Sequence, residues 1–260
     1  MTAQPVALIS AGASGIGLAC ARALTETGYR VLTLDIDAEA IARFQEEFGE
    51  SSALVCDVSD ASQVEAVFHS LVDPHQRVDL LFNNAGIAGP QQPVEDIGVA
   101  AWQSTIDIDL NSVFYLTRCV IPLMKSRRSG VILNMSSSAG RYGCPMRSPY
   151  VAAKWAAIGL AQTWAMELGP WNIRVNALCP GSVGGERIDR VIDCDADERG
   201  VTTDEIRRMY QRQSSLRDFV SPEDIAAMVC FLAGSGGRMI SGQTLGIDGH
   251  TESLANWLDP

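Results

Sequence analysis

The chain has 260 residues, with 31 acidic side chains against 20 basic ones and a formal net charge of −11. Such a charge repels nucleic-acid phosphates and anionic lipid surfaces, so we expect neither a nucleic-acid partner nor a membrane partner. The hydrophobic fraction of 47% is typical of globular chains. The apolar runs are strand-length, shorter than the roughly 20 residues that span a bilayer.

The distribution of cysteine, histidine and basic residues bears on metal binding and on location. Seven cysteines never form a CxxC pair, and only three histidines are present, so we expect reduced thiols and no metal site. The first basic side chain is Arg22, which does not fit the start of a secretory signal. We therefore expect a cytoplasmic protein.

Short β-branched or apolar runs alternate with amphipathic helical patterns along the chain. Strands are predicted, in chain order, at 6–10, 30–35, 53–57, 79–83, 131–136, 173–178 and 244–248. Helices are predicted at about 15–27, 38–48, 61–72, 100–126, 149–168 and 222–233. This alternation predicts one α/β domain over residues 1–260: a doubly wound, Rossmann-type parallel sheet of seven strands with helices on both faces.

Residues 181–220 interrupt the alternation. They contain several glycines, a heavily charged stretch at 189–199 and a helical pattern around 203–213. Long connections in compact domains are usually functional or disordered. We predict a substrate lid at about 181–220.

A glycine-rich turn, SAGASGIG at 10–17, follows the first predicted strand. The helix that begins there offers backbone amides and a positive dipole to a pyrophosphate. The strict GxGxxG spacing is absent, so the turn by itself also fits a structural strand–helix corner. Asp35, at the end of the second predicted strand, favours a dinucleotide because a carboxylate there accepts hydrogen bonds from a ribose 2′-hydroxyl and repels a 2′-phosphate. The two features together favour NAD over NADP.

Tyr150 and Lys154 are four residues apart on a predicted helix and therefore share one of its faces. With five tyrosines and two lysines in the sequence, chance predicts about 0.04 pairs at this spacing. Free tyrosine has a pKa of about 10 and accepts protons poorly at neutral pH, but a nearby ammonium favours the phenolate. We predict that Tyr150 is a general acid/base; a solvent-facing pair is the alternative.

These motifs together resemble the short-chain dehydrogenase/reductase family over nearly the whole chain. The matching segments are the turn at 10–17, Asp57-Val58, NNAG at 83–86, Asn111, Ser136-Ser137, Tyr150 with Lys154, and Pro180-Gly181. The resemblance implies an NAD-dependent enzyme that transfers a hydride between a secondary alcohol and the corresponding ketone. We expect a small polar or hydroxylated substrate.

The resemblance also implies a role for each matching residue. Ser137 and Tyr150 would bind the substrate oxygen, Lys154 would support Tyr150, and Asn111 would hold a water in a proton relay. The alternative for Asn111 is an ordinary helix residue whose side chain is satisfied by a backbone carbonyl. The implied cofactor contacts are Ser14, Gly15, Ile16, Gly17, Asp35, Asp57, Val58, Asn83, Ala85, Gly86, Tyr150, Lys154, Pro180, Gly181 and Val183.

One residue departs from the family pattern, and further expectations concern the substrate, alternative activities and the oligomeric state. Ala11 stands where the family has its first turn glycine, so we expect a variant path for this loop. Arg141 and Arg147 fit an anionic substrate, with pairing to acids of the lid as the alternative. A 3-oxoacyl-type ketone reductase and a same-fold epimerase or dehydratase are alternative activities. The resemblance further implies a homotetramer.

Overall fold

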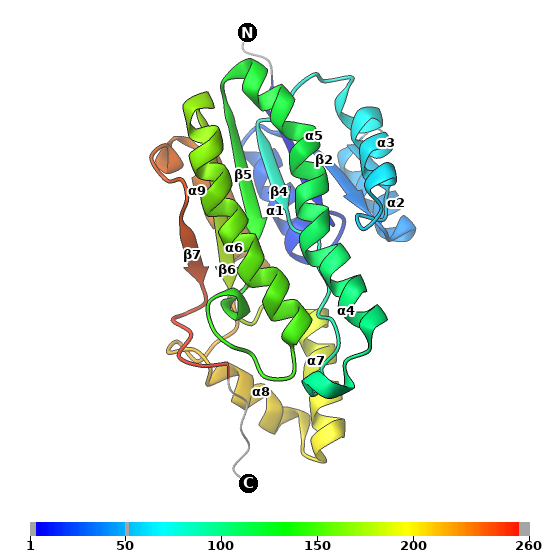
Figure 1. The fold of residues 1–260 in the computed structure, drawn as a ribbon, viewed down its shortest axis with the longest axis vertical. Coiled ribbons are helices and arrows are strands. Elements are labelled where there is room, and N and C mark those ends of the chain that lie inside the picture. The colour runs from blue at the N-terminus through cyan, green and yellow to red at the C-terminus, as the bar shows by residue number, and fades with distance from the viewer. Residues whose placement is uncertain (1–3, 50–51, 255–260) are drawn as a thin grey trace.

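The computed structural model describes residues 4–49 and 52–254, and its centre is a parallel sheet. The described strands pair in the order β3-β2-β1-β4-β5-β6-β7 (Figure 1). Their bounds are β1 Val6–Ser10, β2 Arg30–Asp35, β3 Ala53–Val55, β4 Leu80–Asn83, β5 Gly130–Met135, β6 Ile173–Pro180 and β7 Thr244–Ile247. The predicted doubly wound, seven-stranded sheet is confirmed.

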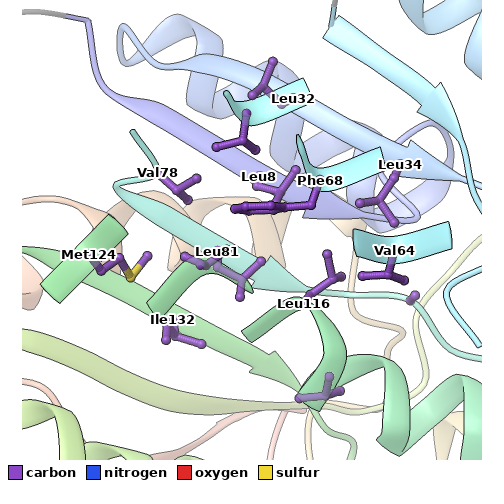
Figure 2. Packing of buried hydrophobic residues seen from close by; sticks show 14 of the residues in the cluster. Leu8, Leu32, Leu34, Val64, Phe68, Val78, Leu81, Leu116, Met124 and Ile132 are labelled. Atoms are coloured by element: carbon purple, nitrogen blue, oxygen red, sulfur yellow. The ribbon is translucent and has the colours of Figure 1, made fainter. Parts of the chain in front are cut away.

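Helices cover both faces of the sheet because its side chains alternate between two apolar clusters. Leu8 points to the cluster under α3, α5 and α6, whereas Ala7 and Ile9 point to the cluster under α1, α2 and α9. Figure 2 shows part of the first cluster, where Phe68 lies against Leu8. The helices are α1 Gly15–Glu26, α2 Ala38–Phe48, α3 Ala61–Val72, α4 Val99–Ile106, α5 Ser112–Arg127, α6 Ser148–Leu168, α7 Glu186–Arg199, α8 Thr203–Gln211 and α9 Pro222–Ala233.

The strand order fixes where a ligand can bind. The chain winds outward in one direction from β1 to β2 and β3, and in the other direction from β4 to β7. Ligands of such sheets bind at the carboxyl ends of the strands where the winding reverses, here between β1 and β4. The loops after these strands carry the glycine turn and the NNAG motif.

Two segments differ from the sequence-based expectation. The helix expected at 100–126 is divided into α4 and α5 by a π-helical segment, Asp107–Asn111. The charged stretch at 189–199 lies within α7, which packs with α8 around Ile192, Ala196 and Ile206. Both helices lie at the end of the molecule toward which the strands point (Figure 1). None of the described helices is long and apolar enough to cross a membrane.

Candidate active site

The glycine turn presents a helix N-terminus whose amides are available. Ser14 is the N-cap of α1, but its side chain makes no capping hydrogen bond within the described residues. Gly15 has φ +50°, and a Cβ there would meet nothing within 4 Å, so its backbone is open to a ligand. A Cβ at Gly17 would collide with the Ala11 carbonyl oxygen, so the turn and the helix can approach only with glycine here. This open, closely wound turn fits a pyrophosphate.

Ala11 adopts the left-handed conformation, with φ +50°. Its N–H donates to the Leu34 carbonyl at 2.7 Å, and its carbonyl accepts from Asn84 Nδ2 at 3.0 Å. These bonds hold an L-residue in a region that costs it about 1–2 kcal/mol. The departure from glycine therefore adds backbone strain at the turn.

Substituting Ala11→Gly should relieve this strain. We expect stabilisation by about 1 kcal/mol, which corresponds to a rise in Tm of about 2–4 °C for a chain of this size. Thermal unfolding followed by circular dichroism measures it. Ala13→Gly in the same turn is the control, because Ala13 has no positive φ and is buried, so this change should lower Tm. A lower Tm for Ala11→Gly would contradict the strain.

Asp35 lies at the end of β2, against the glycine turn. Its Oδ2 accepts from the Ala13 N–H at 3.3 Å, and its Oδ1 accepts from the Asp37 N–H at 3.2 Å. Asp37 instead caps α2 by accepting from the Glu39 and Ala40 amides. Asp35 is therefore the carboxylate placed beside the turn.

The three consecutive serines after β5 have different environments. Ser136 is buried and donates to the Lys154 carbonyl at 2.7 Å, and Ser138 is buried and donates to the Pro180 carbonyl at 3.1 Å. Ser137 is only half-buried, and its Oγ accepts from the Ala139 N–H at 3.1 Å. Among the described residues nothing accepts a hydrogen bond from its O–H, so this group can donate to a ligand. Ser137 is thus the serine available to a ligand.

Tyr150 and Lys154 lie on one face of α6, as their spacing predicts. Lys154 Nζ is 5.4 Å from the centroid of the Tyr150 ring and donates to the Met135 carbonyl at 3.2 Å. Lys154 is buried, whereas Tyr150 is half-buried and its hydroxyl has no partner in the described part of the chain. The site therefore combines a free phenol with a buried cation.

The predicted role of Asn111, to hold a water that links to Lys154, stays a prediction, and the described residues show no direct hydrogen bond between these two side chains. Asn111 Nδ2 donates to Asp107 Oδ1 at 2.7 Å within the same π-helical segment. The side chain beside the lysine belongs to Asp109, whose Oδ2 is 3.1 Å from Lys154 Nζ. Sequence reasoning missed Asp109 because it expected a continuous helix, whereas the π-helical segment changes which side chain faces α6.

The remaining predicted cofactor residues follow the ends of four strands. Asn83 turns inward, where its Nδ2 donates to Thr117 Oγ1 and Asn134 Oδ1. Its neighbour Asn84, which the prediction did not include, donates to the Ser10 and Ala11 carbonyls and joins the NNAG loop to the glycine turn. The others lie after β1 (Ile16), β3 (Asp57, Val58), β4 (Ala85, Gly86) and at or after the end of β6 (Pro180, Gly181, Val183).

The two arginines expected at the substrate both have protein partners. Arg141 lies 3.4 Å from Asp248, after β7. Arg147 donates to the Ala88 carbonyl at 3.2 Å and to Gln91 Oε1 at 2.5 Å. Arg147 thus holds the loop after β4.

The same Gln91 joins that loop to α7. Gln91 Nε2 donates to Asp195 Oδ1 at 2.9 Å, and the buried Asp195 also accepts from Arg199 Nε and the Tyr210 hydroxyl. Burial, with the Asp195 charge adding to it, raises the pKa of Tyr210 to about 12, so this phenol stays a proton donor. Arg147, Gln91 and Asp195 form a continuous chain of contacts, which we call the latch.

A turn that fits a pyrophosphate, a half-buried serine hydroxyl and a phenol beside a buried cation suit proton-coupled redox chemistry on a nucleotide. The fold and site therefore define an oxidoreductase of the Rossmann type. Residues 10–250 match the family model described as enoyl-(acyl carrier protein) reductase. The chain belongs to the short-chain dehydrogenase/reductase family, which uses a nicotinamide cofactor.

Three similar proteins span a range of activities. A 3-oxoacyl-[acyl-carrier-protein] reductase FabG of Thermotoga maritima is 34% identical over 248 residues, covering 94% of this chain and 96% of that protein. The structure of an NAD⁺-bound xylitol dehydrogenase has a TM-score of 0.87 at 30% identity, covering 94% and 97% of the two chains. That of an actinorhodin polyketide ketoreductase with NADPH has a TM-score of 0.89 at 30% identity, covering 98% of each.

Proposed function

We propose that this protein is an NAD-dependent dehydrogenase that oxidises a secondary alcohol to the corresponding ketone. The observation that carries the proposal is the free Tyr150 phenol, whose ring centroid lies 5.4 Å from the Nζ of the buried Lys154. The hydroxyl of the half-buried Ser137 supports it. Asp35 supports NAD in particular, because its carboxylate beside the glycine turn would repel the 2′-phosphate of NADP.

Ser137, Tyr150 and Lys154 each have a separate role in the proposed reaction. A bound NAD⁺ would supply the hydride acceptor for the oxidation of the alcohol carbon. Ser137 donates its hydrogen bond to the substrate oxygen and orients it toward Tyr150. Tyr150 takes the hydroxyl proton, and the Lys154 charge stabilises the phenolate that this needs. In the reverse direction, Tyr150 returns the proton to the oxygen of a ketone.

We propose a small polar or hydroxylated substrate, including anionic ones, and a lid made of α7 and α8. The lid begins next to Gly181 and Val183. Its two ends are joined by the β-bridge between Val183 and Val220. Arg187, at the start of α7, donates to the Gly86 carbonyl at 3.3 Å and so brings a cation to the edge of the site. The similarity to a xylitol dehydrogenase favours hydroxyl-rich substrates.

We also propose a homotetramer. Phe114 on α5 and Trp155 on α6 each expose 51% of their surface, and Met166 exposes 82%. Large apolar side chains exposed on two neighbouring helices are typical of contact surfaces between subunits.

A substrate panel tests the proposed reaction. Purified protein is mixed with NAD⁺ or NADP⁺ and with polyols, sugars, hydroxy acids or cyclic alcohols, and NAD(P)H absorbance is followed. We expect oxidation of at least one class of secondary alcohol, with kcat/KM at least about 10-fold higher for NAD⁺ than for NADP⁺.

The alternative, a 3-oxoacyl-type ketone reductase, has support from the T. maritima relative and the NADPH-containing structure. Reduction of 3-oxoacyl thioesters with NADPH, without oxidation of any alcohol in the panel, would replace the proposal with this activity.

A further inference from the structure

A second charged group lies inside the reaction site. Asp109 is completely buried, and its Oδ1 accepts from the Ile87 N–H at 2.7 Å. Its Oδ2 accepts no hydrogen bond within residues 4–49 and 52–254 but lies 3.1 Å from Lys154 Nζ. A buried carboxylate without such a cation would be costly, so the two groups form an ion pair.

Local structure holds this pair in place. Asp109 is in the middle of the π-helical segment, which turns its side chain toward α6. A Cβ at Gly86 would lie 3.1 Å from Lys154 Nζ and 3.2 Å from Asp109 Oδ2, so only glycine leaves both groups undisturbed. The NNAG loop therefore packs directly over the ion pair.

The charges around Lys154 are few. From its own helix α6 it faces the Tyr150 phenol, and from β5 it faces the Met135 carbonyl. The loop after β4 contributes the neutral Gly86 and Ile87, and α7 contributes Arg187, which binds the Gly86 carbonyl. Asp109 is the acid paired with Lys154 in the described structure, and its charge offsets that of the ammonium.

We propose that Asp109 is a positioning residue that sets the pH range in which Tyr150 works. Its carboxylate holds the Lys154 side chain through the ion pair. It also opposes the loss of the phenol proton by cancelling part of the lysine charge. Removing the charge of Asp109 therefore lets the Tyr150–Lys154 pair lose its proton at lower pH. This inference rests on the proposed role of Tyr150 as the proton acceptor.

The first test is the pH profile of kcat/KM for alcohol oxidation by the full-length protein. Asp109→Asn keeps the shape of the side chain and an acceptor for the Ile87 amide. We expect the rising limb of the profile to move to lower pH by about one unit or more. Asp107→Asn is the matched control. Asp107 accepts hydrogen bonds from Gln103 and Asn111, and in the part of the chain that the structure describes it forms no ion pair with Lys154, so the rising limb of this variant should not move. An unmoved limb in Asp109→Asn, or one at higher pH, overturns the inference.

A second test needs neither substrate nor cofactor. The ultraviolet absorbance of tyrosinate is titrated in the wild-type protein and in Asp109→Asn, and the same titration of each protein carrying Tyr150→Phe is subtracted. The tyrosinate absorbance of Tyr150, obtained by this subtraction, should rise at lower pH in Asp109→Asn than in the wild type. The same titration curve for both proteins contradicts the inference. This result stands even if no alcohol in the panel is oxidised, which would instead count against the proposed function.

A third test covers the case in which Asp109→Asn folds poorly. Lys154→Met leaves the buried Asp109 carboxylate without its cation and should lower Tm. Adding Asp109→Asn to Lys154→Met removes that unpaired charge and should restore part of the lost Tm. If Tm falls further in the double variant, the two residues are not paired as described and the inference fails.

Discussion

Replacing Tyr150 with phenylalanine should lower kcat for alcohol oxidation by about 10²–10⁴-fold, the usual contribution of a general acid/base. The ring remains, so the ring contact with Lys154 and the packing of α6 are preserved. NADH affinity, measured by fluorescence titration, should change much less than kcat, because the main loss lies in proton transfer.

Tyr115→Phe is the matched control for this prediction. Tyr115 lies on α5, where its ring contacts Phe114 with a centroid distance of 6.0 Å, so losing its hydroxyl should leave kcat unchanged. Turnover that survives Tyr150→Phe at the wild-type rate would remove the proton acceptor from the proposed reaction.

Replacing Asp35 with asparagine should lower the preference for NAD⁺ over NADP⁺, given as the ratio of kcat/KM values, by about 100-fold. The amide keeps an oxygen for the Ala13 or Asp37 N–H, but the charge that repels a 2′-phosphate is gone. Steady-state kinetics with both cofactors on one substrate measure the ratio.

Asp37→Asn makes the same chemical change two residues further along. Asp37 caps α2, so this variant should lose some stability but keep the wild-type cofactor ratio. Equal ratios for wild type and Asp35→Asn would mean that cofactor choice is made elsewhere in the site.

The sheet was predictable because strands buried on both faces must be apolar throughout, as in β1, where all five residues are buried. Helix α7 was less predictable from its composition: its many charges mask the few apolar residues, such as Ile192 and Ala196, that pack against α8. Its fold depends on tertiary contacts and on the pair between Asp195 and Arg199, one turn apart.

In the candidate site, too, some features were predictable from the sequence and others were not. The spacing of Tyr150 and Lys154 determines their relative position on any regular helix, so sequence alone placed them together. Asp109 lies in a π-helical segment, and a regular helix does not show that its side chain faces Lys154. For the arginines, residue type indicates charge but not partner, and only the structure shows that Arg147 is occupied by Gln91 and Ala88.

The latch has a consequence for how this enzyme can diversify. Arg147, Gln91 and Asp195 belong to segments that follow three adjacent strands, β5, β4 and β6, so a change in one alters the support of the other two. Substitutions at these positions should show strong epistasis, and new specificities should arise from paired replacements more readily than from single ones. Homologues with a different residue at one latch position are thus expected to carry compensating changes at the other two.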